Sequence, residues 1–191
     1  MRVEYYGEKL KKQLSEQTYA GQKIRVKLDA RDIAGGDKKW EWVKKGAPII
    51  LEIGMRDIEA NTVCMTRRDR FDFGKQSIED AIFVWEAPRV LADIQKTLFE
   101  EARALRQSRL VTDIKTWAGF EAYFSNDADN TFASGQGFIL AKWSGDTDAL
   151  SKLDPLGVTV RCVPFEQSGT TGCCVLTGKP ATQDVIFARA Y

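Results

Sequence analysis

A turn near the C-terminus carries the residues whose types and spacing come closest to a metal-binding motif. The stretch "GCCVLTGKPA" sets Cys173 and Cys174 side by side ahead of a Thr-Gly-Lys-Pro turn. Small domains often hold zinc in a Cys-x-x-Cys-Gly turn, because the glycine lets backbone N–H groups face the sulfurs. Cys174 fits the first ligand position, but Thr177 stands at the second, and the chain contains no histidine. The sequence therefore favours a structural or vestigial turn over a working zinc site.

Patterns that support catalysis are missing from the sequence. It contains no G-x-x-x-x-G-K-[ST] phosphate loop and no G-x-S-x-G elbow. Without histidine the usual nucleophile arrangements cannot form, which leaves carboxylates and lysines as general bases. Acidic pairs such as Asp146 and Asp148 are common among surface acids. The residue types therefore indicate a binding module.

The stretch "GDKKWEWVKKGAP", residues 36–48, is the best candidate for a binding surface, because it interleaves cations with indoles. A helical repeat places these side chains on two faces, with Lys38, Trp42 and Lys45 on one and Lys39, Trp40 and Lys44 on the other. Lysines can contact phosphates, and an exposed indole can stack on an unpaired base for roughly 1–3 kcal/mol per base. Trp42 is expected in the core, whereas Trp40 fits the core and the surface equally well.

Length and composition are those of a globular protein. The 191 residues are 43% hydrophobic and 29% charged, enough for one large domain or two small ones. No apolar run approaches the roughly 20 residues of a membrane helix, and the start lacks the apolar stretch of a signal peptide. Together with four irregularly spaced cysteines, this predicts a cytoplasmic protein without a membrane segment.

The net charge of +1 conceals an asymmetry along the chain. Residues 1–75 hold 17 Lys and Arg against 12 Asp and Glu, whereas residues 76–191 hold 11 against 15. The contrast suggests two units, of which the basic one is better placed to meet a polyanion, although such an excess is also typical of a solvated face.

Hydrophobic periodicity predicts alternating helices and strands in the first part of the chain. The expected elements are a helix through Tyr6, Leu10 and Leu14 stopped by Gly21, a half-buried strand "KIRVKLD" with Ile24, Val26 and Leu28 on one face, a short helix within residues 36–48, an interior strand "IILEIG" and its hairpin neighbour "NTVCMTRR". The longest helix is expected to open at Pro88, with an apolar stripe of Leu91, Ile94, Leu98, Ala102 and Leu105, and to end near residue 108.

The second part of the chain repeats this alternation. The expected elements are a helix at 113–124, a loop to Gln136, a strand at 137–143, a short helix near 147–153 and strands at 158–164 and 185–191. The candidate core residues are Phe138, Leu140, Val160, Val185 and Phe187, and Cys162 is expected to be buried with Val158 and Val160.

Six sequence blocks then point to a known family. They are "KIRVKLDARD", "WEWVKKGAPIILEIGMRDIEANTVCMTRRD", "GFILAKWSGD", "VTVRCVPFEQ", "TGKPA" and "IFARAY". In this order they resemble the C-terminal half of prolyl-tRNA synthetases of the archaeal and eukaryotic type. The resemblance implies an anticodon-binding α/β domain with a mixed sheet at residues 1–108, and at 109–191 an α/β domain similar to the family's zinc-binding domain. The first strand of the family's anticodon-binding domain and the family's catalytic domain have no counterpart in this sequence.

The resemblance also explains the cysteine turn. It relates the family's four zinc ligands to Ser144, Ala149, Cys174 and Thr177, so only one thiol remains. We therefore expect no zinc and a fold held by core packing.

The positions that the resemblance relates to anticodon reading have also changed. They correspond to Lys39, Val43 and Ile50, whereas Arg56 and Asp57 match the family. Base-specific hydrogen bonding is expected to be weakened, while Lys39 and Lys44 can keep phosphate contacts, which position a nucleic acid without reading it. The predicted nucleic-acid-binding residues are Lys38, Lys39, Trp40, Lys44, Lys45, Arg56 and Asp57.

The implied function is that of the tRNA-binding part of a proline-tRNA ligase. This chain would hold the anticodon stem-loop of proline tRNA and brace a catalytic domain that binds ATP and Mg, in a homodimeric parent, with Tyr191 returning towards that domain. By itself the chain is expected to have no catalytic residue, no cofactor and no activity. Two alternatives stay open: a divergent paralogue reused for protein interaction, and a stand-alone domain that binds RNA nonspecifically.

Overall fold

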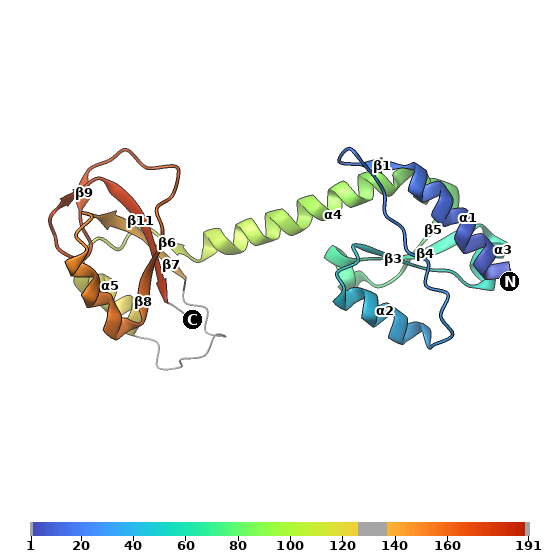
Figure 1. Ribbon diagram of the computed structural model, residues 1–191, viewed down its shortest axis with the longest axis horizontal. Coiled ribbons are helices and arrows are strands. Elements are labelled where there is room, and N and C mark those ends of the chain that lie inside the picture. The colour runs from blue at the N-terminus through green and yellow to red at the C-terminus, as the bar shows by residue number, and fades with distance from the viewer. Residues whose placement is uncertain (1, 126–136, 190–191) are drawn as a thin grey trace. The chain divides into compact units, whose positions relative to one another are not determined.

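The computed structural model describes residues 2–125 and 137–189 (Figure 1). The chain divides into two compact units, Met1–Ala102 and Arg103–Tyr191. Both combine helices with an open sheet, so the predicted α/β class is confirmed. No helix among the described residues is long and apolar enough to cross a bilayer. The domain limits of 1–108 and 109–191 stay predictions.

The first unit packs helices around a three-stranded sheet. Its helices are α1 (Arg2–Glu16), α2 (Gly35–Lys44), α3 (Met55–Ala60), the 3-10 helix η1 (Arg68–Phe73) and most of α4 (Asp80–Ser108). Its strands are β1 (Thr18–Tyr19), β2 (Gln22–Lys23), β3 (Ile49–Glu52), β4 (Thr62–Arg67) and β5 (Gln76–Glu79). The described strands pair in the order β3-β4-β5 and are antiparallel throughout, so the mixed sheet expected for this unit is not found among them. Strand β4 contributes the buried Val63 and Met65 to the core.

The chain after α1 differs from the prediction. Leu10 and Leu14 are buried as their spacing predicts, but α1 ends at Glu16 and Gly21 is not its stop. Ala20 and Gly21 both have positive φ, 50° and 77°, and they form the two-residue turn between β1 and β2. Two such residues match the right-handed twist of a hairpin.

The strand expected in "KIRVKLD" is reduced to β2. Ile24 and Val26 pack against the core as the alternation predicts. However, the pairing of β2 with β1 ends at Lys23, and residues 24–28 are not assigned to a strand. Alternating apolar residues indicate which side chains face the core, whereas a strand also needs a neighbouring backbone to pair with.

Two further elements of the first unit were mispredicted. The strand at Ile49–Glu52 is an edge of the sheet and not an interior strand, because β4 pairs with both β3 and β5. The connection to β4 is not a simple hairpin, since it contains α3, which ends at Asn61 with φ 51°. Asparagine tolerates this left-handed conformation and so terminates the helix.

Helix α4 begins at Asp80, eight residues before the predicted start at Pro88. Asp80 Oδ1 accepts a hydrogen bond from the Ala81 N–H at 2.6 Å, which satisfies one of the free N–H groups of the first turn. Ile94 is buried as predicted, but Ala102 and Leu105 are exposed. The buried stripe lies earlier in the helix, where it meets the sheet, and comprises Phe83, Ala87, Val90 and Ile94.

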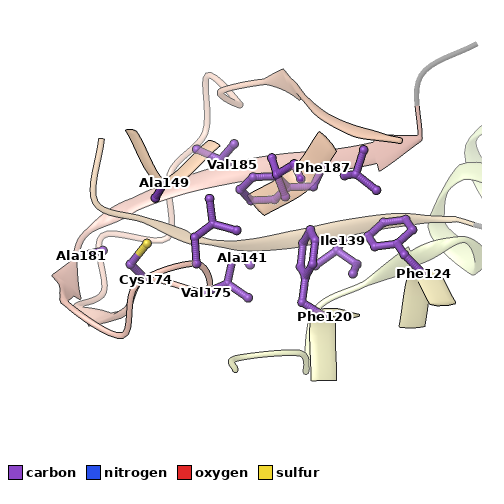
Figure 2. Close-up of a cluster of buried hydrophobic side chains, with 13 residues drawn as sticks. Phe120, Phe124, Ile139, Ala141, Ala149, Cys174, Val175, Ala181, Val185 and Phe187 are labelled. Carbon is purple, nitrogen blue, oxygen red and sulfur yellow. The ribbon is translucent and has the colours of Figure 1, made fainter. Parts of the chain in front are cut away.

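The second unit surrounds a four-stranded mixed sheet of order β6-β7-β11-β8. Its elements are β6 (Leu110–Val111), α5 (Trp117–Ser125), β7 (Phe138–Trp143), the 3-10 helix η2 (Asp148–Leu156), β8 (Val158–Cys162), β9 (Gly172–Cys173), β10 (Pro180–Ala181) and β11 (Gln183–Arg189). Strands β6 and β7 are parallel, while β11 pairs antiparallel with both β7 and β8. Figure 2 shows the core that fills this unit, with Phe120, Phe124 and Phe187 meeting beside Ile139.

Burial in this unit confirms part of the predicted core. Val185 and Phe187 are fully buried, but Phe138 is 37% exposed because β7 turns Ile139 and Ala141 inward. Cys162, expected to be buried, is exposed at the end of β8. The helix expected near 147–153 is η2, a 3-10 helix. The loop to Gln136 and Tyr191 fall largely or wholly outside the described residues.

Candidate nucleic-acid interface

The predicted binding helix exists as α2 and lies at the surface. None of its residues is buried. Asp37 lies in its first turn and Lys44 in its last, where each charge suits the helix dipole. After α2 the chain changes direction at Gly46, whose φ of 81° favours glycine.

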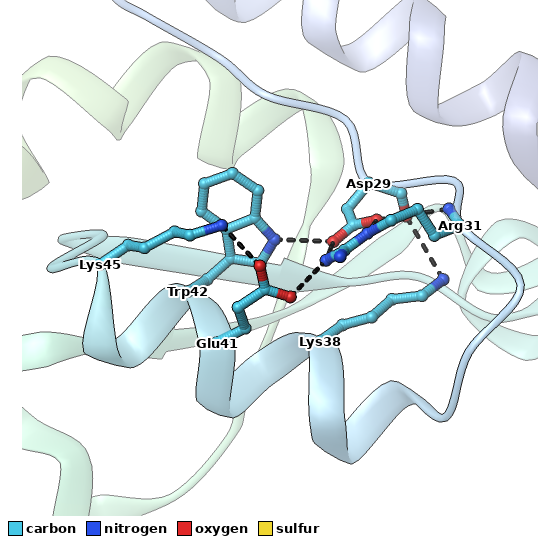
Figure 3. Close-up of polar contacts among 6 residues, drawn as sticks. All are labelled: Asp29, Arg31, Lys38, Glu41, Trp42 and Lys45. Atoms are coloured by element: carbon cyan, nitrogen blue, oxygen red, sulfur yellow. Dashed lines mark hydrogen bonds and ion pairs between the residues drawn. The ribbon is translucent and has the colours of Figure 1, made fainter.

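The first face is organised around Asp29, which precedes α2 (Figure 3). Its carboxylate accepts hydrogen bonds from the Trp42 indole N–H at 2.8 Å and from Arg31 at 2.9 and 2.7 Å. Lys45 Nζ lies 4.6 Å from the centroid of the Trp42 ring. The expectation that Trp42 is a core residue is wrong, because Trp42 is only half-buried and its indole N–H donates to the Asp29 carboxylate.

The charges of this face form one network. Glu41 bridges Arg31 at 2.7 Å and Lys45 at 2.6 Å. Hydrogen bonds from Lys45 and Arg31 lower the pKa of Glu41, and those from Arg31 and Trp42 lower the pKa of Asp29. Both carboxylates are therefore ionised at neutral pH. With Lys38, whose Nζ lies 3.5 Å from the Asp29 carbonyl oxygen, the face carries three cations and two anions and is net positive.

The second face presents an exposed indole. Trp40 is 55% exposed and its ring lies 5.5 Å from that of Phe71, at an interplanar angle of 47°. Lys44 is exposed next to it in the helix. This face therefore offers a flat apolar surface and a lysine that has no ion pair among the described residues, the two kinds of group that bind unpaired nucleotides.

Lys39 does not share that exposure. Its Nζ donates to Thr66 Oγ1 at 3.2 Å, lies 3.6 Å from a Glu52 carboxylate oxygen and sits 5.4 Å from the centroid of Phe71. Its side chain is only 18% exposed. Lys39 therefore supports the fold between α2 and the sheet, and its ability to reach a phosphate is reduced.

A pocket of about 210 Å³ opens beside the Trp40 face, and Phe71, which contacts Trp40, is part of its lining. Its lining residues are Val43, Ala47, Ile50, Thr66, Arg67, Arg68 and Phe71. Val43 and Ile50 are two of the three positions that the resemblance relates to anticodon reading, and the third, Lys39, contacts Thr66 and Phe71 in the lining. The structure therefore brings these positions together around a pocket whose α2 wall is apolar.

The arginines of the pocket are held by the protein itself. Arg67 pairs with Asp69 at 2.7 Å and Asp93 at 2.6 Å, and its side chain is 10% exposed. Hydrogen bonding to Asp69 raises the pKa of Arg67, so it stays charged. Arg68 donates to the Gly46 carbonyl oxygen at 3.1 Å. These bonds fix the shape of the pocket.

Arg56 and Asp57 lie at the start of α3 and are not among the residues that line this pocket. Asp57 accepts hydrogen bonds from the Gly54 N–H at 2.8 Å and from Cys64 Sγ at 3.4 Å, so it caps the helix and ties it to β4. Arg56 is exposed. The Asp57 carboxylate therefore has a structural role, and both of its oxygens are engaged within the protein.

Sequence reasoning missed Asp29, Arg31, Glu41 and Phe71. The only local signal was the "DARD" spacing, which lets Arg31 fold back on Asp29. Nothing in the sequence linked Asp29 to Trp42 or Phe71 to Trp40, because these contacts join different elements.

The cysteine turn of the second unit buries Cys174 and is closed by a backbone hydrogen bond. Cys174 is 1% exposed, and the Gly178 N–H donates to its carbonyl oxygen at 2.8 Å. Burial acts to raise the pKa of the Cys174 thiol, but the polar groups of Ser144, Thr177 and Leu176 outweigh burial and lower this pKa to about 7. Hydroxyl and N–H groups thus surround the sulfur where a metal would need further ligands.

These residues do not fit a zinc ion. Ala149 belongs to the hydrophobic core, and hydroxyls of serine and threonine are not among the usual zinc ligands. No group of three or more Cys, Asp and Glu side chains that could hold a metal occurs in residues 2–125 and 137–189. Lys179 and Asp146, paired at 3.0 Å, link the two loops that would otherwise share the ion.

Comparison with known proteins finds one family match in each part of the chain. Residues 1–84 match the family described as anticodon binding domain, and residues 126–191 match that described as prolyl-tRNA synthetase, C-terminal. A proline-tRNA ligase of Paramagnetospirillum magneticum is 48% identical over 180 residues, which are 94% of this chain and 35% of the relative. One from Protochlamydia amoebophila is 41% identical over 186 residues, covering 97% of this chain and 37% of the relative. This chain thus spans little more than a third of the length of these bacterial relatives.

A solved structure shows the same fold. The crystal structure of prolyl-tRNA synthetase from Cryptosporidium parvum, complexed with L-proline and AMP, superposes with a TM-score of 0.78 at 22% identity, covering 98% of this chain and 37% of the other. The chain therefore has the two domains of the C-terminal part of prolyl-tRNA synthetases, an anticodon-binding domain followed by the family's C-terminal domain.

Proposed function

We propose that this chain is the tRNA-binding C-terminal part of a prolyl-tRNA synthetase, which ligates proline to its tRNA. The observation that carries the proposal is the match of residues 1–84 to an anticodon binding domain whose helix α2 exposes Trp40 and Lys44. The chain holds the anticodon stem-loop of proline tRNA and braces a catalytic domain. In the parent enzyme, a cytoplasmic homodimer, ATP and Mg belong to that catalytic domain. The assignment to the archaeal and eukaryotic type is not supported, because the sequence relatives above are bacterial.

The geometry favours backbone contact over base reading. Lys38, Lys44 and Lys45 offer positive charge at the surface of α2, and Trp40 offers a stacking platform. The α2 wall of the neighbouring pocket is apolar at Val43, so it can enclose a base without hydrogen bonding to its edge there. Affinity is therefore expected to come mostly from phosphates and stacking.

Binding of a proline anticodon stem-loop is expected to be weak and strongly salt-dependent. Phosphate contacts release counterions, so affinity falls steeply as salt rises. The measurement compares, at two salt concentrations, the proline loop with a scrambled loop on the same stem. A preference of several hundred-fold for the proline loop at both salts would show that base reading is intact. Absence of binding to either loop would instead favour the protein-interaction alternative.

Trp40→Ala is expected to weaken stem-loop binding by about 5- to 150-fold, the equivalent of roughly 1–3 kcal/mol for one stacked base. Trp85→Ala is the matched control, because Trp85 is 76% exposed on α4 of the same unit. Fluorescence titration of both variants with labelled RNA measures the difference. Equal affinities for the two variants would exclude Trp40 as a stacking platform.

We also propose that the turn around Cys174 holds no zinc, because hydroxyls and an alanine stand where thiolates are needed. Elemental analysis is expected to find no stoichiometric zinc, and a chelator is expected to leave the melting temperature unchanged. One tightly held zinc per chain would contradict the proposal.

A further inference from the structure

The segment after the β1–β2 hairpin presents a row of cations. Residues 23, 25 and 27 are exposed, whereas 24, 26 and 28 are partly buried. The outward positions are Lys23, Arg25 and Lys27. Alternate residues of an extended chain lie about 6.6–6.8 Å apart, so the three side chains leave the surface at regular intervals on one side.

The inner side of the segment is anchored, which holds the row in place. Ile24 and Val26 pack against the core of the first unit. Leu28 lies under α1, so close that a Cβ added to Gly7 would come within 2.9 Å of its side chain. The cations therefore project from a supported backbone.

Most of this charge is not neutralised by the protein. Among the described residues no hydrogen bond or ion pair joins Arg25 or Lys27 to a carboxylate, whereas Lys23 donates to the Glu16 carbonyl oxygen at 2.9 Å. Lys38 Nζ lies 3.5 Å from the carbonyl oxygen of Asp29, the next residue in the alternation. The row thus continues from the segment to the first turns of α2.

We propose that Lys23, Arg25, Lys27 and Lys38 form a track for the sugar–phosphate backbone of one RNA strand, leading to α2. This inference rests on the proposed function and adds to it the surface that carries the RNA backbone. Regular spacing of cations suits a polymer with one negative charge per nucleotide. The track supplies affinity without base preference.

The test is the double variant Arg25→Ala/Lys27→Ala of the full chain, titrated with the stem-loop at about 50 and 200 mM salt. Each lost phosphate contact lowers the slope of log K against log salt by about 0.7–0.9. The ratio of wild-type to variant affinity is therefore expected to be about tenfold larger at the lower salt. The loss should be the same for the proline and the scrambled loop, because backbone contacts do not read bases.

Lys9→Ala/Lys12→Ala is the control, since both lysines are exposed on α1 of the same unit and the charge change is identical. An equal loss in the control would show an effect of net charge and overturn the track. An unchanged slope in Arg25→Ala/Lys27→Ala would overturn it too, while wild-type binding would leave the proposed function standing. Absence of wild-type binding would overturn both. Melting temperatures within a degree or two of wild type are expected for all variants, because the changed side chains are exposed.

Discussion

Phe187→Ala is expected to destabilise the second unit by about 3–5 kcal/mol, the range for removing a buried phenylalanine ring. Phe187 is 0% exposed on β11, the strand that pairs with both β7 and β8. Its ring meets that of Phe120 edge-on, with centroids 5.3 Å apart and an interplanar angle of 88°. Truncation would leave a cavity facing Phe120 that the paired strands cannot close.

Urea unfolding with amide hydrogen exchange measures this effect, because exchange shows which unit opens. Faster exchange is expected in β7 and β11, with little change in β4 of the first unit. Phe165→Ala is the control, since Phe165 is fully exposed in the same unit and should change stability by less than about 0.5 kcal/mol. A loss below about 1 kcal/mol for Phe187→Ala would mean that the aromatic cluster does not hold this unit together.

Lys142→Met is expected to cost about 3–5 kcal/mol at neutral pH, because it leaves the carboxylate of Asp184 buried without its cation. Lys142 Nζ lies 2.8 Å from Asp184 Oδ1, and the two side chains are 13% and 10% exposed. The Ser168 N–H donates to Asp184 Oδ2 at 2.7 Å, so the same carboxylate anchors the loop before β9. The lower end of the range is favoured, since about a tenth of each side chain still reaches solvent.

The cost of Lys142→Met should depend on pH. Burial acts to raise the pKa of Asp184, but hydrogen bonds from Lys142 and Ser168 outweigh it, and the folded pKa lies below its ordinary value. The stabilisation from the pair is therefore fully present above the unfolded pKa of about 3.9 and is lost as pH falls through the lower folded value. The difference between wild type and Lys142→Met should shrink below about pH 4.

The double variant Lys142→Met/Asp184→Asn separates the ion pair from packing. It removes the unpaired charge, so it should be more stable at pH 7 than Lys142→Met alone. Chemical denaturation at pH 7 and at pH 3.5 provides both comparisons. A double variant less stable than the single one would place the cost in lost packing of the Lys142 side chain.

Local patterns in the sequence were sufficient to predict which side chains share one face of a regular helix. The spacing of residues 38–45 predicted two mixed faces of α2, and the structure gathers Lys38, Trp42 and Lys45 on one of them. The four-residue spacing of Leu10 and Leu14 predicted their burial on α1. A helix imposes its own repeat on the side chains, so these outcomes need no partner element.

The tertiary structure alone decided which of these side chains are free to act. Trp42 is tied to Asp29 and Lys39 is drawn to Thr66 and Glu52, although both looked available for other roles in the sequence. The partners Asp29, Glu52 and Thr66 lie 13 to 27 positions away in the sequence, so a local pattern cannot show whether they come within reach.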